Sequence, residues 1–455
     1  MVSPRQQILA GWGNCPVQPA IVHEPWTWQA LRRAVTAASE PTLISRGLGR
    51  SYGDPALNRD GGVIVQAGLD RMLDFDEATG VLTCEAGVSL AAIIDHLLPR
   101  GWFLPTTPGT RHVTIGGAIA SDVHGKNHHV DGSFGKFVEQ IALLTADGAV
   151  RICSPDDDAA LFWATVGGMG LTGVILWASV RLRRVETAYY HVTYRRAGHV
   201  HEALDIFAQT DADYRHSVAW IDCLAGGSQL GRSVVMLGRE APVEALPVKL
   251  ARRPLVPPRR ATRSVPVFMP SFVLNRLSGM TFNGLYYARH DDGTAIEDYR
   301  SFFYPLDGVD HWNRIYGRRG IVQYQALLPR ESSRDGLVAM LRQVVRRGAG
   351  AYLAVLKSAG QANPGMLSYL FPGHTLAMDM PYAGMRTVKL MRELDAILLD
   401  HGGRLYLAKD SQTTAAAFAR MYPRLDEFRQ VKARVDPHHR FVSSQARRLG
   451  IVEGS

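Results

Sequence analysis

Three glycine-rich segments, each at the end of a predicted strand, constrain the fold of this chain more than any other feature. The first, RGLGRSYGD at 46–54, follows the apolar run TLIS. The second lies within PGTRHVTIGGAIASDVHGKNHH at 108–129, and the third is GGMGLTG at 167–173. Glycine costs folding entropy, so a cluster indicates a backbone that bends unusually or approaches another group closely. Three clusters predict a long, flat ligand held between backbone segments.

The glycine segments also indicate the kind of ligand. Successive backbone N–H groups at such turns form nests that bind phosphate, and a dinucleotide has a pyrophosphate and enough length to touch several loops. The spacing in GLGRSYG misses the G-x-G-x-x-G pattern of nicotinamide-binding Rossmann units, and no helical pattern follows it. The alternative, that the glycines only turn corners, would be preferred for one cluster but not for three.

Local patterns predict alternating strands and helices over the first 185 residues. Apolar residues of 26–38 share one helical face. Ser89 is the expected N-cap of a helix over 90–100. Residues 138–155 predict a hairpin with Asp147-Gly148 in the turn.

The pattern of predicted loops and strands changes after this first part. From about 190 to 400 the loops are longer and strand-like alternation is frequent, and a helical pattern covers 414–435. We therefore expect a first domain over 1–190, a second over 191–404, and a C-terminal segment over 405–455 that returns to the first domain.

Composition limits the class of protein. Hydrophobic residues make up 46% and charged residues 20%, which is typical of a soluble globular chain. No run approaches the roughly 18 apolar residues of a membrane helix, and the N-terminal sequence lacks the apolar region of a secretory signal. We expect a cytoplasmic protein or one peripheral at the inner membrane, with the periplasmic side left open. The four cysteines form no CxxC pair, which argues against a zinc ribbon or a disulfide scaffold.

The charge balance favours anionic partners. Lys and Arg outnumber Asp and Glu by 51 to 42, a formal net charge of +9. The segment KLARRPLVPPRRATR at 249–263 is basic, contains no acid, and has three prolines that disfavour a stable helix. Nucleic-acid binding is suggested by charge alone, because no recognisable binding module occurs and the glycine clusters would remain unexplained.

These motifs carry a family resemblance. The three glycine segments resemble the flavin-binding half of the vanillyl-alcohol oxidase/p-cresol methylhydroxylase superfamily and, within it, the decaprenylphosphoryl-β-D-ribose 2′-oxidase family. The likeness continues through WNRIYG (312–317), DMP (379–381) and GGRLYLAKDSQTTAAAFARMYPRLDEF (402–428). Aldonolactone and alditol oxidases are more distant relatives. The resemblance implies an α+β fold with two domains: an FAD-binding domain of two α/β subdomains, and a substrate domain with a large antiparallel sheet.

The resemblance implies that the glycine loops hold FAD. In several relatives that bind FAD covalently, a histidine occupies the place of Arg50; arginine cannot form that link, so we expect non-covalent FAD. The implied cofactor-binding residues are Arg46, Gly47, Leu48, Gly49, Arg50, Ser51, Tyr52, Gly53, Pro108, Gly109, Thr110, Thr114, Gly116, Gly117, Ala118, Ser121, His124, Gly125, Asn127, Gly170, Thr172, Gly173, Val174 and Tyr406.

The implied reaction is hydride transfer from a hydroxyl-bearing carbon to flavin N5, with Lys409, His124 and Tyr52 as catalytic residues. Lys409 matches the family's essential lysine; if desolvated it can act as a base. The alternative is a surface lysine paired with Asp410. A metal site at His124 and its neighbouring histidines is disfavoured, because no cysteine and no HExxH pattern accompanies them.

The resemblance also implies a sugar pocket. Gln323 and Gln325 share one strand face by the two-residue period. Ala377 stands where mycobacterial enzymes carry a cysteine that electrophilic inhibitors trap, and Thr375 stands where an amide side chain is expected, so the glycosyl group can differ. The implied substrate-binding residues are Trp220, Tyr287, Gln323, Gln325, Lys357, Thr375, Ala377 and Lys409.

The expected partners follow from this chemistry. They are a polyprenyl-phosphate sugar as substrate, an NAD(P)H-dependent keto-reductase, a quinone-like or oxygen acceptor, and a membrane surface contacted through 249–274. The alternative for the basic segment is a solvated loop. The alternative substrate is a soluble alditol, sugar or aldonolactone, for which that segment has no membrane role.

Overall fold

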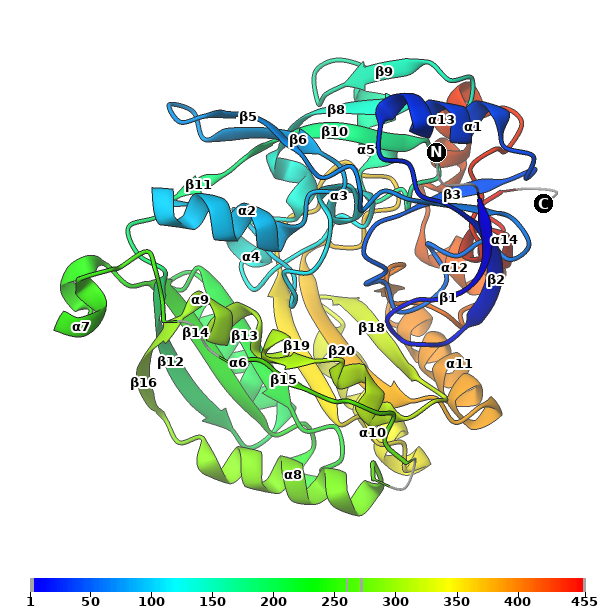
Figure 1. The fold of residues 1–455 in the computed structure, drawn as a ribbon. Coiled ribbons are helices and arrows are strands. Elements are labelled where there is room, and N and C mark those ends of the chain that lie inside the picture. Colours follow the sequence, from blue (N-terminus) through cyan, green and yellow to red (C-terminus); the bar gives the residue numbers. More distant parts are fainter. Residues whose placement is uncertain (1–3, 259–260, 271–272, 453–455) are drawn as a thin grey trace.

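The computed structural model describes residues 4–258, 261–270 and 273–452, and its three largest sheets have four, five and eight strands (Figure 1). The four-stranded sheet has the order β1-β2-β4-β3, with β2, β4 and β3 parallel and β1 antiparallel at the edge. Buried Leu31 and Val35 give its helix an apolar face, as the spacing predicted. Its elements are β1 (Arg5–Ala10), β2 (Val17–His23), α1 (Trp28–Ala37), β3 (Leu43–Arg46) and β4 (Gly62–Val65).

The five-stranded sheet is antiparallel, in the order β5-β6-β10-β8-β9. The predicted hairpin is confirmed: Asp147 accepts hydrogen bonds from the Thr145 hydroxyl and the Ala149 N–H, and Gly148 has a φ of +78°. Ser89 caps its helix by accepting from the Ala92 N–H at 3.1 Å. The elements here are β5 (Met72–Asp76), β6 (Val81–Glu85), α2 (Leu90–Leu97), β7 (Trp102–Phe103), α3 (Ile115–Ala120), α4 (His128–Asp131), β8 (Val138–Leu144), β9 (Val150–Cys153), α5 (Ala159–Thr165), β10 (Val174–Arg181) and β11 (Arg183–Arg184).

The eight-stranded sheet is antiparallel, in the order β16-β12-β14-β13-β19-β20-β18-β21. Helices α6, α10 and α11 pack on one of its faces and share its largest apolar core. This large sheet confirms the expected α+β class. Its strands are β12 (Tyr189–Ala197), β13 (His216–Ile221), β14 (Ser233–Glu240), β16 (Gly293–Asp298), β18 (Ile321–Pro329), β19 (Leu353–Ala359), β20 (Gly373–Pro381) and β21 (Arg404–Leu405). The helices and remaining strands of this part are α6 (Val200–Thr210), α7 (Val248–Ala251), β15 (Arg263–Ser264), α8 (Arg276–Arg289), α9 (Tyr299–Phe303), β17 (Val309–Asp310), α10 (Ser333–Arg347) and α11 (Met385–Asp400).

The C-terminal segment packs back on the first sheet, and the N- and C-terminal elements lie side by side in Figure 1. Leu43 of β3 forms a parallel bridge with Phe441. The helical pattern at 414–435 forms two helices rather than one, because Pro423 has no N–H to continue the first. The helices are α12 (Ala415–Met421), α13 (Leu425–Val435) and α14 (Ser444–Leu449).

A buried ion pair ties this segment to the third glycine turn. Lys432 of α13 donates to the carbonyls of Leu171 and Phe441 at 2.8 and 2.9 Å and pairs with Asp436. Both charged side chains are almost completely buried. The pair therefore fixes the turn at 167–173 from a point more than 250 residues away.

Candidate active site

A cavity of about 660 Å³ is lined on one side by the glycine turns and on the other by the eight-stranded sheet. Its volume falls within the range of roughly 300–1,000 Å³ found for ligand sites. The predicted site residues that line it are Gly47, Leu48, Gly49, Arg50, Ser51, Tyr52, Pro108, Gly109, Thr110, Thr114, Gly116, Gly117, Ser121, His124, Gly170, Gly173, Trp220, Gln323, Gln325, Lys357, Ala377, Tyr406 and Lys409.

The first glycine turn presents unpaired backbone donors to this cavity. Gly49 has a φ of +65°, the left-handed region that glycine enters without strain. Among the residues that the structure describes, no acceptor receives a hydrogen bond from the backbone N–H groups of 47–51. At Gly109 of the second segment, an added Cβ would meet no atom within 4 Å. Free N–H groups and open backbone of this kind fit the pyrophosphate of FAD.

A lysine and a carboxylate lie together beside this turn. The Lys409 ammonium lies 4.1 Å from the centroid of the Tyr52 ring. Burial lowers the pKa of Lys409 to about 8; the Asp379 carboxylate opposes this and the Lys357 ammonium adds to it. Burial raises the pKa of Asp379 to about 7, limited by a hydrogen bond from the Gln323 amide and by Lys409. Both groups therefore titrate near neutral pH, as a proton-transfer site requires.

His124 lies against the aromatic ring of Tyr406. The two ring centroids are 5.1 Å apart, and the Tyr406 hydroxyl donates to the Ser121 carbonyl at 2.7 Å. Gln325 Nε2 lies 3.0 Å from His124 Nε2; an amide nitrogen can only donate, so His124 accepts there and carries its proton on Nδ1. Burial holds the pKa of His124 well below its usual value, reinforced by Lys357. The ring is thus neutral, and its buried Nδ1 has no partner among the described residues.

Strand register explains how the sheet builds the other wall. Gln323 pairs with Asp379, and Gln325 pairs with Ala377. Across the next strand, Ala377 pairs with Val355. Side chains two residues apart share a face, so β18, β19 and β20 present Gln323, Gln325, Asp379, Ala377, Val355 and Lys357 to the cavity in adjacent rows.

An apolar wall extends from these rows toward α8. The Trp220 and Tyr286 rings lie 4.5 Å apart, and both line the cavity together with Phe282. The prediction that Tyr287 lines the pocket is wrong. Neighbouring residues on a helix point about 100° apart, and Tyr287 faces the guanidinium groups of Arg196 and Arg232 instead, at 4.2 and 4.9 Å.

Nine predicted residues, Tyr287 included, lie outside the cavity lining. Arg46 donates to the carbonyls of Ala10 and Ala56 and so braces the first turn. Thr375 lies behind Gln325, with its hydroxyl 2.7 Å from the Tyr369 hydroxyl. The nine residues are Arg46, Gly53, Ala118, Gly125, Asn127, Thr172, Val174, Tyr287 and Thr375.

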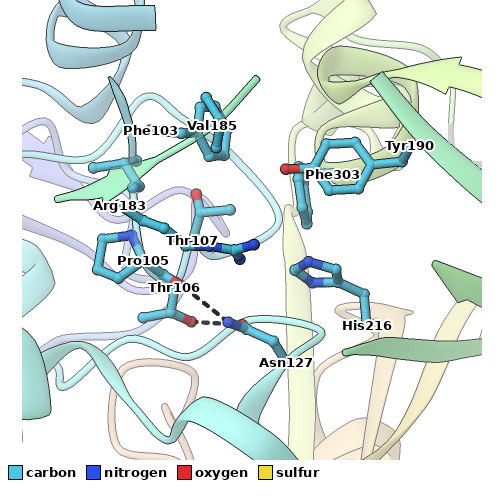
Figure 2. Close-up of a pocket in the computed structure, with 11 residues that line it drawn as sticks. Phe103, Pro105, Thr106, Thr107, Asn127, Arg183, Val185, Tyr190, His216 and Phe303 are labelled. Atoms are coloured by element: carbon cyan, nitrogen blue, oxygen red, sulfur yellow. Dashed lines mark hydrogen bonds between the residues drawn. The ribbon is translucent and has the colours of Figure 1, made fainter. Parts of the chain in front are cut away.

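Asn127 supports the loop from a second, much smaller pocket. Figure 2 shows its amide bonded to Pro105 and Thr106 in this pocket. It also donates to Asp131 at 2.6 Å. Asn127 therefore orders the loop that carries His124 rather than contacting the main cavity.

The sequence interpretation missed five Asp, Glu and Lys residues of the cavity. Asp379, Lys126, Glu297, Asp307 and Asp310 all line it. The two-residue period that places Ala377 on the cavity face also places Asp379 there, so a signal for Asp379 was present. Lys126 lies two residues after His124, but only the path of the loop shows that its side chain reaches the cavity. In the described part of the chain, no cluster of three or more His, Cys, Asp or Glu could hold a metal ion.

Comparison with known proteins shows the family to which this chain is similar. Residues 19–154 match a family model described as an FAD binding domain, and residues 375–449 match one described as D-arabinono-1,4-lactone oxidase. The chain is 40% identical over 453 residues, 98% of its own length and 97% of the relative's, to decaprenylphosphoryl-β-D-ribose oxidase of Mycolicibacterium smegmatis. It is 24% identical to L-gulono-1,4-lactone dehydrogenase of Mycobacterium tuberculosis over 96% of this chain and 98% of that one. It is 32% identical to L-gulonolactone oxidase of Bos taurus over 37% and 38% of the two chains.

The fold and the cavity thus define a two-domain, FAD-dependent oxidoreductase. The match to a full-length relative is the narrower finding. The chain belongs to the decaprenylphosphoryl-β-D-ribose oxidase family.

Proposed function

We propose that this protein oxidises the C2 hydroxyl of a polyprenyl-phosphoryl-β-D-ribose to the 2-keto sugar, using non-covalently bound FAD. The observation that carries the proposal is the buried Lys409–Asp379 pair, which lies where the glycine turns meet a polar sheet face. The relative in Mycolicibacterium smegmatis is named for oxidation of decaprenylphosphoryl ribose. The same proposal assigns cofactor binding to 1–190 with 405–455, and substrate binding to 191–404.

The chemistry that FAD supplies when bound is acceptance of a hydride at N5. The neutral Lys409 amine takes the proton of the C2 hydroxyl, and the Asp379 carboxylate stabilises the ammonium that forms. Gln323 and Gln325 lie on the sheet face opposite the glycine turns and orient the sugar hydroxyls. Gln325 contacts Nε2 of His124, so the N–H at Nδ1 is available to donate a hydrogen bond to a ligand in the cavity. Tyr52 shields the lysine from water.

Non-covalent binding of FAD rests on Arg50. Its guanidinium lies 4.2 Å from the centroid of Trp12, and burial lowers its pKa against the opposing effect of Asp307. A guanidinium held in this way has no nucleophilic nitrogen to attack the flavin methyl group. Arg50 is then a cation at the cofactor rather than a covalent anchor.

The membrane proposal concerns residues 249–274. Of its basic residues, Lys249, Arg252, Arg253 and Arg263 are exposed, while Arg259 and Arg260 lie outside the described residues. Exposed Val267 and Phe268 accompany them. Leu255 and Val265 of the same segment pack on the protein instead. Each basic residue near an anionic surface contributes up to about 1 kcal/mol.

Helix α8 adds apolar surface that the sequence interpretation did not include. Leu277, Met280, Phe282 and Leu285 are exposed on it, with Leu277 at 75%. Phe282 also lines the cavity, so the exposed apolar face is continuous with the substrate site. This continuity supports loading of a polyprenyl chain from a bilayer. No helix among the described residues is long and apolar enough to cross a membrane.

Two further partners follow from the proposed reaction. The reduced cofactor needs an electron acceptor, for which we propose a quinone or oxygen. The 2-keto product needs an NAD(P)H-dependent reductase if it is to become the arabinose epimer. A soluble aldonolactone or alditol is the second candidate substrate, favoured by the match of 375–449 to a lactone oxidase model.

Anaerobic reduction of the flavin separates the two candidates. Farnesylphosphoryl ribose should bleach the yellow protein, whereas alditols, free sugars and L-gulono-1,4-lactone should not. Lys409→Ala should remain yellow without bleaching. Bleaching by free polyols or lactones, together with peroxide release in air, would instead establish the soluble-substrate oxidase. Liposome flotation with Arg252→Glu/Arg253→Glu tests the membrane surface: binding to anionic vesicles equal to that of the wild type would reject it.

A further inference from the structure

We propose that Lys126 and Lys357 form an anion subsite that holds the phosphodiester of the substrate. The inference rests on the proposed function, because it assigns a place to the phosphate of that substrate. Both lysines line the main cavity, and their side chains are only partly exposed. They come from different halves of the fold, one from the loop after α3 and the other from β19.

Backbone contacts bring the two lysines together. The Ser217 N–H of β13 donates to the Lys126 carbonyl at 2.8 Å, which fixes the loop over that strand. β13 pairs with β19, with Ala219 opposite Leu356, so Val218 and Lys357 continue the same register. Lys126 therefore stands above the strand that adjoins Lys357. The lowered pKa of Lys126, to about 7, includes a contribution from the Lys357 ammonium, which agrees with this proximity.

A bound phosphodiester would favour the ammonium form of both lysines, because the protein itself gives neither one a directly paired counter-charge. Lys126 donates to the Phe302 carbonyl and lies 4.1 Å from the centroid of that ring. Neither lysine forms a salt bridge with a described carboxylate. Glu297 lines the cavity and attracts Lys126, but it also accepts a hydrogen bond from Tyr194. Of the other acids in the lining, Asp307 and Asp310 act on Arg50, and Asp379 acts on Lys409. Among the described cations of the lining, Lys357 is therefore the one whose pKa no carboxylate raises.

The position of this charge matches the substrate. The charges of Lys357 and Lys409 both lower the pKa of His124, and all three residues line the cavity, so the proposed subsite and the proposed base lie near the same imidazole ring. In a ribosyl phosphodiester the phosphate is on C1, the carbon next to the one that is oxidised. An anion held by Lys357 and Lys126 would place C2 toward His124 and Lys409, and the lipid chain toward the apolar wall at Trp220.

Charge-removing variants test the subsite. Lys126→Met and Lys357→Met keep the aliphatic stem, and Lys389→Met on the exposed face of α11 is the matched control. Binding is measured with farnesylphosphoryl ribose and with neutral farnesyl riboside by perturbation of the flavin spectrum. Each cavity variant should weaken the phosphodiester by roughly ten- to a hundredfold, as for loss of a hydrogen bond to a charged group, and change the neutral ligand by less than about twofold. Lys357→Arg should restore part of the loss.

The outcomes distinguish this inference from the proposed function. Equal weakening of both ligands, or no change in either, would overturn the anion subsite. Farnesyl phosphate, which has no ribose to oxidise, is tested in parallel. If farnesyl phosphate binds in a manner that depends on both lysines while farnesylphosphoryl ribose fails to bleach the wild-type flavin, the subsite stands and the proposed oxidation falls. Retained flavin colour and melting temperature show that the variants are folded.

Discussion

Replacement of Asp379 by asparagine should move the pH dependence of flavin reduction to lower pH. Asp379 lies on β20 and accepts a hydrogen bond from Gln323, and its charge raises the pKa of Lys409. Asparagine has nearly the same size and keeps an oxygen for Gln323, but it carries no charge. Lys357 continues to lower the pKa of Lys409 in the variant. The Lys409 ammonium thus loses its stabilising partner and keeps its repelling one.

The charges in the cavity set the size of this displacement. Burial and Lys357 bring the pKa of Lys409 to about 8 even with Asp379 present. A nearby opposite charge changes a pKa by about 1–3 units. Burial outweighs Asp379 in setting the pKa of Lys409, so the lower end applies. The displacement is then about one pH unit, which corresponds to about 1.4 kcal/mol.

The sign follows from the proposed role of Lys409 as a base. Reduction requires the neutral amine, so its rate rises as pH increases through the pKa of Lys409. We expect a rising limb near pH 8 in the wild type and about one unit lower in Asp379→Asn. Stopped-flow bleaching under anaerobic, single-turnover conditions excludes reoxidation from the measured rate.

An exposed carboxylate provides the control for this experiment. Asp400→Asn at the end of α11 removes the same charge far from the cavity and should keep the wild-type profile. A limb that stays in place in Asp379→Asn, or that moves upward, would refute the coupling of Asp379 to Lys409. A limb that persists in Lys409→Ala would show that another group titrates.

Three further predictions concern the cofactor and the fold. Gly117→Leu should purify colourless but keep the wild-type melting temperature measured without cofactor. An added Cβ at Gly117 meets only a hydroxyl at 3.1 Å, and the longer side chain then enters the cavity. The control Gly293→Leu also has open space but lies outside the cavity, and it should remain yellow. Trichloroacetic acid should release all of the flavin into the supernatant, as expected with Arg50 in the loop, whereas flavin retained in the pellet would establish a covalent link. Asp436→Asn should lower the free energy of unfolding in urea by about 3–5 kcal/mol, because it leaves the buried Lys432 ammonium without a counter-charge; a change below about 1 kcal/mol would show that the pair adds little stability.

Much of the fold was predictable because local chemistry determines it. The Ser89 cap and the Asp147-Gly148 turn each depend on residues within a few positions of one another. The attachment of the C-terminal segment depends on a different kind of contact. Lys432 reaches a carbonyl 261 residues away, and no local pattern encodes such a partner. The sequence pattern predicted that this segment returns to the first domain, but it did not show which contacts hold the segment there.

The site divides in the same way. Gln323 and Gln325 were predictable as a pair from strand periodicity, and the structure places both on the cavity face. Periodicity alone could not choose between Tyr286 and Tyr287, because it does not show which face of the helix is turned toward the cavity. Lys126 depends on a loop whose path is fixed by a hydrogen bond to β13, so its approach to Lys357 required the three-dimensional structure.

Isotopic analysis of the product tests the central proposal most directly. The anaerobic reaction with farnesylphosphoryl ribose is treated with borodeuteride, the phosphodiester is hydrolysed, and the sugar is reduced with unlabelled borohydride for mass spectrometry. If the C2 hydroxyl is oxidised in the cavity that Lys409 lines, deuterium is expected at C2 alone, in a mixture of ribitol and arabinitol. Deuterium at another carbon, or an unlabelled sugar from protein that carries its flavin, would contradict the account.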